Sequence, residues 1–142
     1  MIGEHYRLEI FNERSQKYHA KYFATIADAW EHLPEPWSIL LPSPENLRKY
    51  ALIKAGHCDA TTFVLKNRPE ALAALAAFRL FDGYCLATAT KNVVTVWRAR
   101  SQRKAVQDAR QFYETTQKVF TIIGEIIGVD PLTLYNPDDY KP

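Results

Sequence analysis

The feature that most constrains this chain is an apolar periodicity that runs from Ser101 to Gly128. When each residue is advanced by about 100°, as in an α-helix, apolar side chains collect on one side and charged ones on the other. The sequence therefore predicts an amphipathic helix of about seven turns over residues 101–128. The apolar stripe consists of Ala105, Ala109, Phe112, Thr116, Phe120, Ile123 and Ile127.

Both ends of this predicted helix carry recognisable signals. Ser101 is the predicted N-cap, and Gly128 stands where a left-handed C-cap is expected, with Pro131 close behind. An apolar face this wide must be buried, either against the rest of the chain or against a second copy. If part of the stripe is left uncovered, the interface anchors are Phe112, Phe120, Ile123 and Ile127.

Residues 1–41 begin with two alternating segments and continue with helix and turn signals. Residues 6–11 and 18–23 alternate between two faces, which predicts an N-terminal β-hairpin joined by the polar connector 12–17. Thr25 is then the predicted cap of a short helix over residues 26–33, which Pro34 and Pro36 end. The short apolar run 37–41 is interpreted as a third strand.

The middle of the chain carries clearer helix starts. Ser43 followed by Pro44 predicts a helix that Gly56 stops, and residues 61–65 form a β-branched run that predicts a strand. Asn67 and Glu70 resemble a capping box at the start of an alanine-rich helix that extends to residue 81.

Residues 84–99 fit two structures. They are rich in β-branched residues, with Lys91 and Asn92 as a two-residue turn, but Leu86, Ala89, Val93 and Trp97 also fit a helical face. The hairpin is favoured, because a backward extension of the long helix places Arg98 in its apolar stripe. Residues 129–142 are expected to be an irregular tail.

These elements predict an α+β fold. A small antiparallel sheet with an N-terminal hairpin is covered by helices, and the 101–128 helix is its long spine. At 142 residues, with 47% apolar and 24% charged residues, the chain is expected to form a single globular domain over 1–142.

A basic segment is the strongest electrostatic signal. Residues 91–110 hold six basic residues and one acid, although the whole chain carries a net charge of only +2. Such a cluster suits an anionic partner, phosphate or an acidic protein, and Trp97 could stack on a base. The alternative is a solvated or internally paired face. The candidate contact residues are Trp97, Arg98, Arg100, Arg103, Lys104 and Arg110.

Catalytic and cofactor motifs are missing from the sequence. It contains no glycine-rich phosphate loop, no nucleophile elbow and no metal-ligand spacing, so we expect no catalytic residue, no cofactor and no metal. His57, Cys58 and Asp59 are the densest group of reactive side chains. Neighbouring residues face different ways on regular elements, so these three are interpreted as a loop rather than a catalytic site.

Two function classes lead the expectations, and an enzyme of an unrecognised type, with an active site assembled from scattered residues, is a third. The first is a non-enzymatic protein-interaction or assembly domain that acts through the long helix, with a protein partner or a second copy of itself. The second is a nucleic-acid-associated accessory protein that uses the basic segment. The sequence shows no signal peptide and no apolar run long enough to span a membrane, so no membrane partner and a cytoplasmic location are expected.

Overall fold

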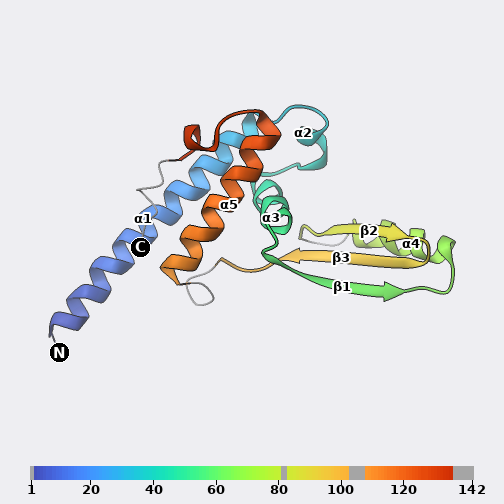
Figure 1. Cartoon of the computed structure of the whole chain (residues 1–142), viewed down its shortest axis with the longest axis horizontal. Helices are drawn as coiled ribbons and strands as arrows, with labels where there is room; N and C mark the ends of the chain where they lie inside the picture. Colours follow the sequence, from blue (N-terminus) through green and yellow to red (C-terminus); the bar gives the residue numbers. More distant parts are fainter. Residues whose placement is uncertain (1, 81–82, 103–107, 136–142) are drawn as a thin grey trace.

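A computed structural model describes residues 2–80, 83–102 and 108–135, with side chains from Lys17 onward. Figure 1 shows a layer of helices from which a small sheet extends to one side. The elements in chain order are α1 (Ile2–Glu31), α2 (Trp37–Leu40), α3 (Pro44–Lys54), β1 (Cys58–Val64), α4 (Arg68–Phe78), β2 (Leu86–Thr90), β3 (Val93–Ala99), α5 (Ala109–Ile127) and the 3₁₀ turn η1 (Pro131–Thr133). The predicted α+β class is confirmed.

The larger core lies where α1, α3 and α5 pack together. Each helix contributes an apolar stripe, and the turn after α5 closes the cluster when Tyr135 stacks on Phe120, with ring centroids 4.8 Å apart. The long apolar face of α5 is therefore buried by the chain's own helices. The buried members are Tyr22, Ile26, Ala29, Leu41, Leu47, Ala51, Leu52, Phe112, Val119, Phe120, Ile123 and Tyr135.

A smaller core lies between the sheet and α4. The strands pair in the order β1-β3-β2, with both pairings antiparallel. Alternate residues of β3, Val94 and Val96, face α4 and pack with Ala87 of β2 and Ala71 of α4. The small side chain of Ala71 lets the helix approach the sheet closely. The 84–99 segment is thus the hairpin that its β-branched composition favoured, with Lys91 at positive φ in the turn.

Helix α5 is shorter than the periodicity predicted. Its N-cap is Asp108, whose side chain accepts from the Gln111 amide while Gln111 caps the Asp108 amide in return. The predicted start at Ser101 is wrong, because the capping box begins the helix seven residues later, at Asp108. Gln102, which the prediction placed in the helix, is instead buried in the core. Residues 103–107 lie outside the described residues. The C-terminal prediction is confirmed: Gly128 is left-handed, with φ of 78°.

Gly124 allows the chain to turn back over the end of α5. A Cβ added there would lie 2.9 Å from the Val129 carbonyl oxygen and 3.3 Å from the Pro131 ring. The same residue accepts hydrogen bonds from the amides of Gly128 and Val129 through its carbonyl oxygen. A glycine inside a helix is therefore explained here by a close backbone approach, which the sequence pattern did not reveal.

The N-terminal β-hairpin prediction is wrong, because residues 2–31 form the single helix α1. The alternation at 18–23 is also compatible with helical spacing, and Tyr22, Ile26 and Ala29 are buried at intervals of four and three. The connector 12–17 contains no Gly or Pro to impose a turn. Thr25 lies inside the helix, where its hydroxyl donates to the Lys21 carbonyl at 2.9 Å.

Two further predictions, for residues 37–41 and for residues 57–59, differ from the structure. Residues 37–40 form the short helix α2 rather than a third strand, because the Leu40 and Leu41 amides bond back to the carbonyls of Pro36 and Trp37. Cys58 and Asp59 belong to β1 rather than to a loop. The Ser43 cap of α3 and the Asn67 cap of α4 are confirmed, although α4 ends at Phe78.

Burial of the α5 stripe predicts a large cost for truncating it. Ile123 is 0% exposed in the larger core, so Ile123→Ala should lower the free energy of unfolding by about 2–5 kcal/mol, measured by urea denaturation. Ile39 on α2 is 70% exposed and provides a matched control, for which Ile39→Ala should change stability by about 0.5 kcal/mol or less. Equal effects of the two substitutions would contradict this assignment of the core.

Candidate functional site

The predicted interface anchors on α5 pack inside the molecule. Phe112, Phe120 and Ile123 are buried in the larger core, and Ile127 is half-buried against it. Phe112 also stacks on His19 of α1, with ring centroids 3.9 Å apart. These side chains hold helices together within one chain, so any surface for a partner must be sought elsewhere.

The basic segment does not form one continuous surface in the described residues. Arg98 lies exposed at the end of β3, and Trp97 is half-buried on the opposite face of that strand. Arg100 follows β3 and its Nη2 lies 2.9 Å from Asp59 Oδ1, while Arg110 on α5 pairs with Glu114 at 3.3 Å. Arg103 and Lys104 lie outside the described residues. The predicted basic end of a long helix is therefore split between β3, the segment after it and the start of α5.

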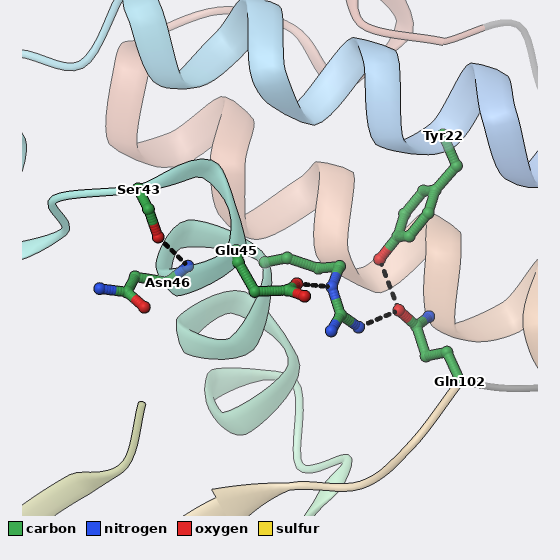
Figure 2. Close-up of polar contacts among 6 residues, drawn as sticks. Tyr22, Ser43, Glu45, Asn46 and Gln102 are labelled. Atoms are coloured by element: carbon green, nitrogen blue, oxygen red, sulfur yellow. Dashed lines mark hydrogen bonds and ion pairs between the residues drawn. The ribbon is translucent and has the colours of Figure 1, made fainter. Parts of the chain in front are cut away.

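Gln102 is the centre of a buried hydrogen-bond network. Its Oε1 accepts from the Tyr22 hydroxyl at 2.8 Å and from Arg48 Nη1 at 3.0 Å, and its Nε2 donates to Thr115 Oγ1 at 2.9 Å. Figure 2 shows Tyr22 and Gln102 pointing toward each other, with Glu45 on α3 beside them. One side chain thus joins α1, α3 and α5 to the segment that leaves the sheet.

Arg48 is held in a fixed orientation within this network. Its side chain is 12% exposed, its Nε donates to Glu45 Oε1, and its guanidinium carbon lies 5.5 Å from the centroid of the Phe23 ring. The Arg48 hydrogen bond is the main reason that the pKa of Glu45 lies below its ordinary value of 4.5, and partial burial opposes it. Glu45 is therefore ionised and balances the arginine.

A cleft of about 600 Å³ opens beside this network, and we call it the junction cleft. It lies where α1, α3 and the segment after β3 meet. Three basic side chains and one carboxylate line it, so its wall has an excess of positive charge. Its lining residues are His19, Phe23, Glu45, Arg48, Lys49, Ala99, Arg100, Ser101 and Gln102.

Sequence reasoning found one member of this cleft, Arg100, and missed the others. Arg48 and Lys49 lie on α3, about fifty residues before Arg100 in the chain. No spacing rule connects them to Arg100, because the α3–β1 connection and the return of β3 bring them together in space. Gln102 gave no signal either, since a single glutamine is usually an exposed residue.

A second cleft of about 690 Å³ lies between α2, α3 and the start of β2. Its aromatic lining includes Trp37 and Tyr50, with ring centroids 5.1 Å apart, and Tyr84. Burial raises the pKa of Tyr84 to about 12, so this phenol stays protonated at physiological pH. The cleft is mainly apolar, and Arg79 provides the one charged side chain among its lining residues.

The reactive group His57, Cys58 and Asp59 has structural roles. The His57 carbonyl accepts from the Arg100 amide, the Cys58 thiol donates to the Ile53 carbonyl at 3.7 Å, and Asp59 pairs with Arg100. Burial is the largest influence on the His57 imidazole and lowers its pKa below 6.5. Across the part of the chain that the structure describes, no three His, Cys, Asp or Glu side chains gather as a metal site would require.

Among the residues that the structure describes, strand β1 pairs on one side only, with β3, and its other edge is open. The Arg100 amide donates to the His57 carbonyl and the Leu65 amide to the Asn92 carbonyl, so residues 57 and 65 both face β3. Hydrogen-bonded and non-bonded pairs alternate along an antiparallel ladder. The backbone groups of the even-numbered residues of β1 therefore point away from the sheet. These residues are Cys58, Ala60, Thr62 and Val64.

The sheet face opposite α4 carries no charged side chain along its described strands. Residues that share this face are identified by the register, because direct partners in an antiparallel pair point the same way. Val64 is 74% exposed there, and Figure 1 shows α4 on one side of the sheet. The uncharged face consists of Ala60, Thr62, Val64, Leu86, Thr88, Thr90, Val93, Thr95 and Trp97.

Comparisons with protein-family models, with curated proteins and with solved structures found no match to this chain. None of the described helices has the length and hydropathy that crossing a bilayer requires. The features of the molecule that bear on its function are therefore the two clefts, the Gln102 network and the open strand.

The Gln102 network predicts a larger loss of stability for Gln102→Ala than for Tyr22→Phe. Gln102→Ala leaves Arg48, Tyr22 and Thr115 without their shared partner, so we expect a loss of about 1–3 kcal/mol in unfolding free energy. Tyr22→Phe should cost less, about 1 kcal/mol, because Gln102 Oε1 keeps its bond from Arg48. Urea denaturation measures both values, and a larger loss for Tyr22→Phe would contradict the central role of Gln102.

The pairing of Glu45 with Arg48 predicts an acid-dependent stability difference. Because the folded-state pKa of Glu45 is lowered, its contribution is present above the unfolded pKa and is lost as the pH falls through the folded pKa. Wild type should be more stable than Glu45→Gln at about pH 6, and the difference should shrink as the pH falls below 4.5 and Glu45 becomes protonated. Urea midpoints measured across this range check it, and a constant difference would refute the ion pair as its cause.

Proposed function

We propose that this protein is a non-enzymatic assembly domain that pairs with a second copy of itself through the open edge of β1. The observation that carries this proposal is the set of outward-pointing backbone groups at Cys58, Ala60, Thr62 and Val64. Unpaired edge strands are templates for further strand pairing, and proteins that avoid pairing protect them with Lys, Pro or a covering element. β1 contains neither Lys nor Pro, and residues 59–64 are exposed.

A two-fold arrangement uses this edge without an electrostatic penalty. Antiparallel pairing about an axis through Thr61 sets Ala60 of one copy opposite Thr62 of the other, and Cys58 opposite Val64. All four residues have outward backbone groups, so each one meets a partner that can complete its hydrogen bonds. Asp59 falls opposite Phe63, so the two carboxylates of the dimer are not neighbours.

The side chains of β1 suit such a pairing. Thr61, Thr62, Phe63 and Val64 are β-branched or aromatic residues, which favour extended backbone and cross-strand packing. The proposed six-stranded sheet would also extend the uncharged face across the two-fold axis. The interaction class expected from the sequence is kept here, but its surface moves from α5 to β1, because the α5 stripe packs inside the chain.

We also propose a cytoplasmic location for this assembly. Cys58 and Cys85 are free thiols and are both half-buried. Each donates a hydrogen bond to a backbone carbonyl, Cys58 to Ile53 and Cys85 to Phe78, rather than forming a disulfide. Free cysteines suit a reducing compartment.

Sedimentation equilibrium over a concentration series tests the assembly. A single strand pair is small beside the about 1,600 Å² of a standard interface, so we expect a dimer that dissociates on dilution to about 1 μM. Thr62→Pro removes one outward N–H and should shift the protein to monomer with little loss of stability, because that N–H makes no bond to β3.

The matched control places the same substitution on the other edge. Ala89 lies opposite Val94, whose backbone groups face β1, so the Ala89 N–H points away from β3 on the outer edge of β2. Ala89→Pro should remain dimeric, provided that circular dichroism shows both variants folded. Wild type that stays monomeric throughout the micromolar range, or a Thr62→Pro variant that still dimerises, would rule out pairing through β1.

A further inference from the structure

We propose that the junction cleft binds the phosphate group of a phosphorylated ligand. This site adjoins β1 through the Arg100–Asp59 pair but uses side chains rather than the backbone edge of that strand, and it requires neither dimerisation nor catalysis. Its chemistry comes from Arg48 and Lys49 on α3 and from Arg100 after β3, which line one hollow. Guanidinium and ammonium groups that converge on a concave surface are the usual protein ligands of phosphate.

Arg48 is held at the wall of the junction cleft with one guanidinium nitrogen unused by the described residues. Its side chain is 12% exposed, and its described hydrogen bonds use Nε toward Glu45 and Nη1 toward Gln102. Nη2 has no acceptor among the residues that the structure describes. A guanidinium has five N–H donors, so Arg48 can donate from Nη2 to an anionic acceptor that enters the cleft from solvent. The network and the Phe23 ring already fix its orientation, so little entropy is lost on binding.

The local charge balance supports an anion. Arg48, Lys49 and Arg100 face a single lining carboxylate, Glu45, which Arg48 already engages. Arg100 also pairs with Asp59 outside the cleft, but both groups of that pair are more than half exposed, so the pair is weak and can rearrange. Even when Asp59 is counted, one positive charge remains for the ligand.

The size and the rings of the cleft suit more than a bare ion. A volume of about 600 Å³ lies within the usual range of about 300–1,000 Å³ for small-molecule sites. Phe23 is 45% exposed at its wall, and His19 contributes a second ring. Planar rings beside basic groups are the features that hold a base next to its phosphate. A free nucleotide and a nucleic-acid strand share this chemistry.

The experiment measures binding of inorganic phosphate, adenosine monophosphate and a labelled short single-stranded DNA to the full chain. Calorimetry serves for the two small ligands and fluorescence anisotropy for the DNA, at about 50 mM and about 200 mM salt. Binding of the mononucleotide with competition by phosphate identifies a small ligand. Binding of the DNA alone, with affinity that falls steeply with salt, identifies a nucleic-acid strand. Either outcome supports the cleft as a phosphate site.

Substitutions of residues that line the junction cleft test whether the ligand binds there. Lys49→Gln and Arg100→Gln, which spare the Gln102 network, should each weaken binding by about tenfold. Arg98→Gln is the matched control, because Arg98 is exposed two residues from Arg100 but does not line the cleft. Failure of all three probes to bind wild type at about 50 mM salt would overturn the proposal. An equal loss with Arg98→Gln would also overturn it, because binding would then depend on general surface charge.

Discussion

The side chain of Gln102 holds the parts of this fold in one arrangement. It bonds to Tyr22 of α1, Arg48 of α3 and Thr115 of α5, all within 3.0 Å. A buried amide stabilises a structure only when its donors and acceptors are matched, and an unmatched one is costly. Gln102 lies three residues after the end of β3, so the same bonds hold the segment through which the sheet joins the helices (Figure 1).

This arrangement separates two kinds of surface. The helices α1, α3 and α5 bury their apolar stripes against each other, so their outer faces are left to charged residues and the junction cleft. Helix α4 covers one face of the sheet. The other face is uncharged, and β1 pairs on one side only in the described part of the chain. The edge and the cleft adjoin at the Arg100–Asp59 pair but use different groups, the backbone of β1 and the basic side chains of the cleft, so assembly and ligand binding can be tested separately.

Local signals predicted the elements whose ends are capped within a few residues. Ser43, Asn67 and Gly128 act as caps, and Lys91–Asn92 forms the hairpin turn, because each effect depends on backbone geometry within one turn. The hairpin predicted for residues 6–23 failed because alternation in a short window also fits a helix. The Ser101 start failed because the competing box at Asp108 and Gln111 has reciprocal hydrogen bonds.

Periodicity and capping signals in the sequence predicted the α+β class, the positions of α3 and α4, and the apolar stripe that α5 must bury, and composition favoured the β2–β3 hairpin over a helix. These follow from periodicity and capping, which act between residues a few positions apart. Tertiary packing set what buries that stripe, which basic residues meet and which two strands lie at the sheet edges. Arg48 and Arg100 come together because α3 and the end of β3 pack side by side. Such contacts depend on the simultaneous packing of distant segments, and no local pattern in the chain encodes them.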